Sequence, residues 1–110
     1  MGLDICFTER EKTACPHCGK LIPTRDIDSA NSGGREWYDI LGDIGYYVPC
    51  DQRTAENDWY GKDMVLSTEQ AEKVYRYVMR HSDIYNAYNV TGLIARAMLN
   101  KNAVVINADW

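Results

Sequence analysis

The chain has 110 residues, 45% of them hydrophobic, and a formal net charge of −4. This length fits one domain, residues 1–110, with a modest core. The acidic balance disfavours general nucleic-acid binding, which depends largely on Lys and Arg. Because no apolar run is long enough to span a bilayer and no signal segment opens the chain, we expect a cytoplasmic protein without membrane contact, whose four cysteines stay reduced.

The first predicted unit, residues 1–28, is a β-ribbon that carries a metal-binding turn. Residues 3–7 are prone to β structure and predict an opening strand. Residues 8–14 are charged and predict a loop. Residues 21–27 contain Pro23, which is tolerated at sheet edges, so they predict a returning edge strand.

Between these strands lie two thiols three positions apart, Cys15 and Cys18. Pro16 fixes φ after the first thiol, and Gly19 permits a left-handed backbone after the second, which lets amide groups turn towards the sulfurs. A turn of this kind brings two sulfurs to one point. The spacing therefore predicts a Zn²⁺ site.

A closed structural zinc site needs four ligands, and the turn supplies two. The remaining cysteines, Cys6 and Cys50, complete a predicted set of four thiolates. In one alternative, Cys6 is a buried strand residue that acts as a small hydrophobe. In another, His17 or His81 replaces a missing thiolate.

The Cys-Pro-His-Cys sequence also resembles the active site of thioredoxin-like thiol oxidoreductases, and unligated thiols are a third alternative. In those enzymes the first cysteine begins a helix, whose dipole lowers the pKa of that cysteine. Here Gly19 and Pro23 leave no room for such a helix, and only fourteen residues precede Cys15. We therefore favour metal binding.

The second predicted unit, residues 29–110, is an α+β body. Residues 29–34 predict a flexible connector in which Asn31 or Ser32 caps the next helix. The helix that follows has an apolar stripe with helical spacing and is predicted to end at Gly45. Its stripe consists of Trp37, Ile40, Leu41 and Ile44.

A polar stretch without periodicity, residues 51–63, predicts a loop, and residues 64–66 predict a short strand. Ser67 and Gln70 have the spacing of a capping box, which predicts that a helix begins there. The apolar stripe of that helix consists of Ala71, Val74, Tyr75 and Val78.

Residues 84–98 predict another helix, capped by Ser82 or Asp83 and weakened in its middle by Gly92. Residues 103–107 predict a buried strand. The predicted fold class is α+β: one small sheet with about three helices on one face and an N-terminal zinc-knuckle loop.

The chain is most acidic between residues 36 and 63. This stretch contains seven carboxylates and two basic residues, which gives a local charge of −5, and it also contains six aromatic residues. Such a surface suits a protein partner with a basic surface. The predicted partner-binding residues are Asp51, Glu56, Asp58, Trp59 and Tyr60. In the alternative, the two aromatics fold back over an edge of the core.

Four short motifs resemble a set of small uncharacterised proteins of phages and prophages. They are Met-Gly-Leu-Asp-Ile at the start, the inserted Cys-Pro-His-Cys-Gly, a Ser-Ala-Asn run before a helix, and a Leu-Ser-Thr-Glu-Gln helix start. Cys-Pro-x-Cys-Gly is also similar to zinc-ribbon knuckles. The resemblance implies a phage accessory role in the host cytoplasm, including inhibition of a host nucleic-acid enzyme or defence complex.

The leading hypothesis is therefore a small acidic zinc-binding accessory protein that acts through protein–protein interaction. A second is a zinc-knuckle protein that contacts nucleic acid through Lys12, Lys20, Arg25 and Arg35. A third is a small metalloenzyme with an open zinc position, although phosphate-loop, nucleophile-elbow and His-Glu-x-x-His motifs are absent from the sequence. The many tyrosines and Trp110 fit either a homo-oligomer or an aromatic-rich core.

Overall fold

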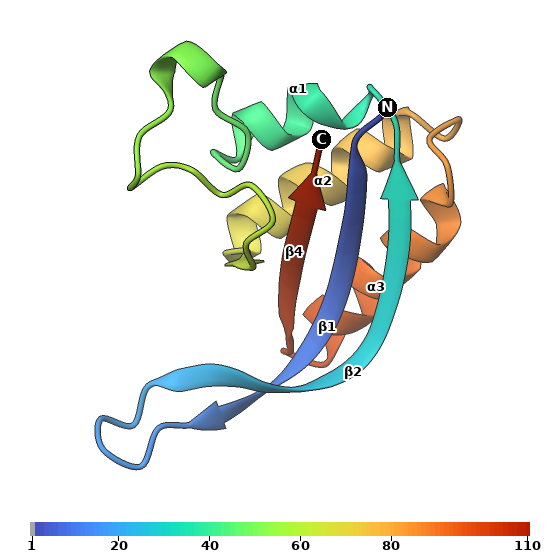
Figure 1. Ribbon diagram of the computed structural model, residues 1–110. Coiled ribbons are helices and arrows are strands. Elements are labelled where there is room, and N and C mark those ends of the chain that lie inside the picture. Colours follow the sequence, from blue (N-terminus) through green and yellow to red (C-terminus); the bar gives the residue numbers. More distant parts are fainter. Residues whose placement is uncertain (1) are drawn as a thin grey trace.

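The computed structural model describes residues 2–110 and confirms the predicted α+β class and order of elements. The elements are β1 (Asp4–Ala14), β2 (Leu21–Gly33), α1 (Trp37–Asp43), the 3₁₀ turn η1 (Cys50–Gln52), β3 (Met64–Val65), α2 (Thr68–Arg80), α3 (Ala87–Leu99) and β4 (Ala103–Asp109). The strands form one antiparallel sheet in the order β2-β1-β4-β3. Helices α2 and α3 cover one face of this sheet, and α1 packs against α2 at one end (Figure 1).

The core lies between the sheet and the helices, because alternate strand residues point to the helical face. In β1 these residues include Ile5 and Phe7, and the paired positions of β4 are Ala108 and Ile106, all buried. The fully buried Trp37 of α1 lies against Phe7, with 5.3 Å between ring centroids. The predicted strands and helices therefore share one apolar core.

The first two strands are longer than predicted. The charged residues 8–14, predicted as a loop, continue β1 as far as Ala14. They are held by pairing across the hairpin, including a 2.6 Å ion pair between Glu11 and Arg25 and a 2.9 Å hydrogen bond between Thr13 and Thr24. A strand stabilised by its neighbour needs no apolar face of its own, so the loop prediction was wrong.

The predicted flexible connector is also wrong, because most of it forms the end of β2. Ser32 is buried there and its hydroxyl accepts a 2.9 Å hydrogen bond from Nε1 of Trp37. Neither Asn31 nor Ser32 therefore caps α1, contrary to the prediction. The residue before α1 is Glu36, and its side chain makes no capping hydrogen bond. These residues build the sheet edge instead of a linker.

The local start and stop signals of two helices are confirmed. Gly45 follows α1 with a φ of +84°, which a glycine adopts without strain. The hydroxyl of Ser67 accepts from the Gln70 amide at 3.1 Å, and the Gln70 side chain accepts from the Ser67 amide at 2.9 Å. This reciprocal pair is the predicted capping box of α2.

The start of α3 differs from the prediction. Neither Ser82 nor Asp83 caps it; the residue before the helix is Asn86, in a left-handed conformation with a φ of +62°. The Asn86 side chain donates a 2.7 Å hydrogen bond to the Asn31 carbonyl of β2. Gly92 does not break the helix, which runs continuously from Ala87 to Leu99. Within residues 2–110, no helix has the length and apolar character needed to cross a membrane.

Candidate metal centre

The predicted metal-binding turn lies at the end of an arm, residues 11–25, formed by the outer parts of β1 and β2 (Figure 1). The pairing of β4 with β1 stops at Arg10, so the strands of the arm pair only with each other. Irregularities in the register follow Glu9 and Glu11, where the ribbon leaves the sheet. Most arm residues are exposed to solvent.

The backbone of the turn closes on itself. The Cys15 amide donates to the Lys20 carbonyl at 2.7 Å, and the Gly19 amide donates to the Cys15 carbonyl at 2.8 Å. Gly19 has a φ of +73°, in the left-handed region that favours glycine. The turn therefore has the closed, glycine-dependent geometry expected of a metal knuckle.

The turn lowers the pKa of one of its two thiols. Hydrogen bonding from the backbone N–H groups of His17 and Cys18, and then from the Cys18 thiol, lowers the pKa of the Cys15 thiol below its ordinary value. Donors aimed at a sulfur favour its thiolate form, which is also the form that binds metals. Cys15 is half-buried and Cys18 is exposed, so an incoming ion can reach both.

The other two thiols lie elsewhere. Cys6 is in the part of β1 that pairs on both sides, opposite Asn31 and Asn107, and Cys15 lies nine positions further on, just past the end of β1, roughly 30 Å along an extended strand. Cys50 is exposed in η1, at the opposite end of the molecule from the tip of the arm (Figure 1). No three Cys, His, Asp or Glu side chains in the described part of the chain are grouped to hold an ion. One chain thus brings two of the four predicted ligands together and leaves the other two apart.

The histidines do not complete the set. His81 follows α2, where its ring stacks on Tyr77 and its Nδ1 lies 2.8 Å from the Tyr77 carbonyl oxygen. His17 is in the turn, but residues 2–110 hold no group of three metal-binding side chains that includes it. The turn at the tip of the arm therefore has two thiols, Cys15 and Cys18, as its candidate ligands.

The surroundings of the pair also differ from the active site of a thiol oxidoreductase. Cys15 and Cys18 lie in a turn that leads into a strand, not into a helix. The lowered pKa of Cys15 therefore has a local cause in the turn amides rather than in a helix dipole. All four cysteines are free thiols.

The predicted partner-binding carboxylates lie in the loop between α1 and β3. Asp51, in η1, and Glu56 are exposed. Asp58 is half-buried, and its Oδ1 lies 3.9 Å from Nε of Arg53. The loop therefore presents exposed acidic groups beside one internally paired carboxylate.

The two aromatics of the loop pack inwards to different degrees. Trp59 is half-buried against the core, 6.3 Å from the Tyr46 ring centroid. Tyr60 is 46% exposed and its ring meets Trp110 edge-on at 4.9 Å. Arg53 lies over the Trp110 ring, with its guanidinium carbon 5.5 Å from the ring centroid. Trp59 thus covers an edge of the core, and Tyr60 is the more accessible of the pair.

The remaining carboxylates of the acidic stretch are divided between two other places. Glu36, Asp39 and Asp43 surround Tyr77, whose pKa is raised chiefly by burial and then by these charges. Asp63 lies at the sheet, where it accepts hydrogen bonds from Asn107 and Arg10; the first of these is the main cause of its lowered pKa. Residues 36–63 therefore do not form one continuous acidic surface.

The basic residues of the nucleic-acid hypothesis are also divided. Lys12, Lys20 and Arg25 are exposed on the arm, whereas Arg35 lies beyond the other end of β2. Residues 12–25 contain no Asp or Glu. The arm also contains Glu11, which pairs with Arg25, so Lys12 and Lys20 make it locally basic on an acidic protein.

Two apolar side chains on the arm add a feature that the sequence reasoning missed. Leu21 and Ile22 follow the turn directly and are 60% and 41% exposed. In the sequence they read as ordinary residues of an edge strand. Their exposure follows from the projection of the arm beyond β4, which the sequence does not encode locally.

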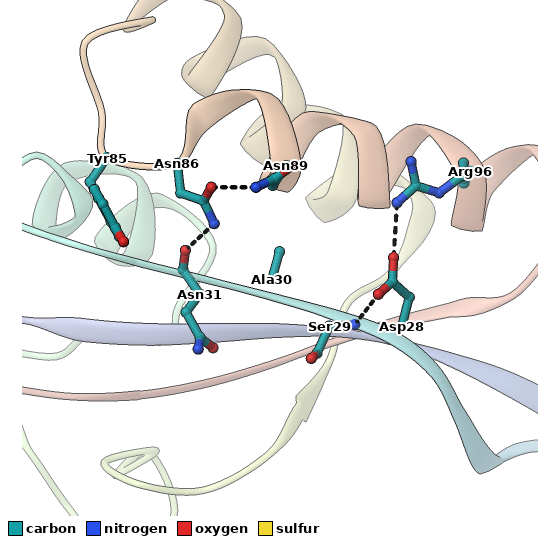
Figure 2. A pocket seen from close by; sticks show the side chains of 8 residues that line it. All are labelled: Asp28, Ser29, Ala30, Asn31, Tyr85, Asn86, Asn89 and Arg96. Carbon is teal, nitrogen blue, oxygen red and sulfur yellow. Dashed lines mark hydrogen bonds and ion pairs between the residues drawn. The ribbon is translucent and has the colours of Figure 1, made fainter.

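A separate hollow of about 440 Å³ lies between β2 and α3 (Figure 2). Its polar groups bind one another: Arg96 pairs with Asp28 at 2.9 Å, and Asn86 bridges Asn89 and Asn31 at 2.5 and 2.7 Å. These contacts fasten α3 to the sheet edge, so we interpret the hollow as a structural seam.

Comparison of the chain with models of protein families, with curated protein sequences and with solved structures finds no match, so the candidate site is interpreted from its own geometry.

Proposed function

We propose that this chain is a zinc-binding interaction protein, which holds Zn²⁺ through Cys15 and Cys18 and acts by contacting another macromolecule. The observation that carries the proposal is the closed turn at the tip of the arm, which holds Cys15 and Cys18 three positions apart and ends at the left-handed Gly19. Paired sulfurs in such a turn are typical zinc ligands. A projecting arm that ends in a metal site is suited to making contacts beyond the body of the protein.

Zinc loading of single-thiol variants tests this proposal. Purified, reduced protein is exposed to Zn²⁺, desalted and analysed for metal. We expect Cys15→Ser and Cys18→Ser to lose at least nine-tenths of the bound zinc, because one remaining thiolate is a weak site. Cys50→Ser is the matched control, since it removes an exposed thiol outside the arm. Wild-type protein that takes up no zinc, or equal loss in Cys50→Ser, would contradict the assignment.

The partner favoured by the exposed loop carboxylates is a protein with a basic surface, such as a host nucleic-acid enzyme or defence complex if the chain is phage-encoded. A second candidate, binding of nucleic acid by the arm, is supported by the exposed cations Lys12 and Lys20 near the turn.

Reversing charges on these two surfaces separates the two candidates. One variant carries Asp51→Lys and Glu56→Lys, and the other carries Lys12→Glu and Lys20→Glu; each serves as the control for the other. For a basic protein partner, we expect the loop variant to lose at least tenfold in affinity in a pull-down while the arm variant keeps it. Salt-sensitive binding to DNA or RNA that only the arm variant loses would instead support the second candidate.

A further inference from the structure

The arm of one chain provides half of a zinc site. Cys15 and Cys18 lie in the closed turn at its tip, and the described part of the same chain brings no third metal-binding side chain to them. Zinc in a structural site binds four ligands in a tetrahedron. Two ligands must therefore come from outside the chain for the site to close.

We propose that a second copy of this chain supplies them, so that Cys15 and Cys18 of two arms bind one Zn²⁺ and join the chains tip to tip. This inference rests on the proposed zinc-binding function and adds its stoichiometry. A tetrahedral ion has twofold axes that divide its four ligands into two equivalent pairs. Two identical two-sulfur turns therefore fill the site in the symmetric arrangement that most dimers adopt.

The position of the turn permits this approach. The arm extends past Arg10, where the pairing of β1 with β4 ends, and Cys18 at its tip is exposed (Figure 1). A second arm can thus reach the sulfurs without first displacing the sheet or the helices. A site within the body would not offer this access to another chain.

The charge of the arm complements the proposed centre. Four thiolates carry −4 and one Zn²⁺ carries +2, so the centre has a net charge of −2. Each arm brings the cations Lys12 and Lys20, while its third cation, Arg25, is paired with the one carboxylate of the arm, Glu11, at 2.6 Å. The cations near the turns therefore offset the charge of the centre, and they also oppose contact between two metal-free arms.

The exposed apolar residues next to the turn fit the same contact. Leu21 and Ile22 are 60% and 41% exposed in the single chain. A second arm that meets the turn shields part of this apolar surface from water, which favours association. Formation of the centre releases the protons that the four thiols still hold and involves no change in oxidation state.

Zinc titration of the reduced, metal-free full chain, read out by native mass spectrometry and light scattering, tests the inference. We expect saturation at one Zn²⁺ per two chains and a mass about twice the 12.6 kDa of one chain. Removal of zinc by a chelator should return the monomer. Cys18→Ser should stay monomeric with zinc, whereas Cys50→Ser should dimerise like the wild type.

The outcomes separate the inference from the proposed function. One Zn²⁺ per chain in a monomer that needs Cys15 and Cys18 would overturn the shared centre and leave zinc binding intact. A dimer that persists in chelator or in Cys18→Ser would also overturn it. No zinc uptake by the wild type would overturn both. Circular dichroism of each variant shows that its fold is retained.

Discussion

Replacing Trp37 with Ala is expected to lower the free energy of unfolding by about 3–5 kcal/mol, the usual cost of truncating a large buried aromatic. The Trp37 side chain is fully buried, and its ring packs on Phe7 of β1. Its Nε1 also donates to the hydroxyl of Ser32, which itself donates to the Tyr85 carbonyl. The substitution leaves a cavity where α1, the sheet and the start of α3 meet.

Urea unfolding followed by circular dichroism measures this effect. Trp37→Phe is the graded comparison: it keeps most of the ring volume and loses the hydrogen bond, so we expect a smaller loss, on the order of 1–2 kcal/mol. Met79→Ala, at a side chain that is 58% exposed, is the surface control and should change stability by about 0.5 kcal/mol or less. A Trp37→Ala variant as stable as the Met79→Ala control would contradict the assigned core.

Replacing Tyr46 with Phe should cost about 1–3 kcal/mol, because it removes one oxygen and leaves a buried donor unpaired. The Ala108 amide donates to the Tyr46 hydroxyl at 2.8 Å, and this hydroxyl donates to the Lys62 carbonyl at 2.7 Å. The Tyr46 side chain is fully buried. One hydroxyl thus ties the segment after α1 to β4 and to the loop before β3.

The pH dependence of the free energy of unfolding, compared between the wild type and Tyr46→Phe, provides a second check. Burial is the main cause that raises the pKa of Tyr46 above its ordinary value of 10.0. Above pH 10 the unfolded chain therefore holds fewer protons than the folded chain, and the stability of the wild type falls as the pH rises through that range. Tyr46→Phe has no phenol at this position and does not lose stability in this way. The difference in stability between the wild type and Tyr46→Phe should therefore become smaller above pH 10. Tyr88→Phe, at an 88% exposed side chain, should show neither effect.

The sequence predicts the elements whose signals are local. Ser67 and Gln70 mark the start of α2, and Gly45 marks the end of α1, because each acts within one turn of its helix. The outer part of β1 escapes prediction because it is held by cross-strand partners such as Arg25, which lies fourteen positions after Glu11. The same holds for Ser32, which is buried and whose hydroxyl donates to the Tyr85 carbonyl, 53 positions later in the chain.

In the candidate site too, some features depend on local sequence and others on the fold. The geometry of the turn follows from the residues of the turn itself, Cys15 to Gly19. The ligands that would close it cannot be read from spacing, because the position of Cys6 depends on which strands pair. The length of β1 decides that Cys6 and Cys15 lie far apart. The turn could therefore be predicted from local sequence, whereas the separation of Cys6 and Cys50 from it follows from the fold.

The edges of the sheet carry a consequence for solubility at high concentration. On one side the Asn86 side chain occupies the Asn31 carbonyl of β2, and on the other β3 has only two residues. The border at β3 therefore offers few free amides and carbonyls to a passing extended peptide, whereas the outer edge of the 13-residue β2 is interrupted at Asn31 and at Pro23, which has no amide to donate. The short β3 disfavours edge-to-edge pairing of neighbouring molecules on its side of the sheet, and such pairing at high concentration is expected at β2 instead.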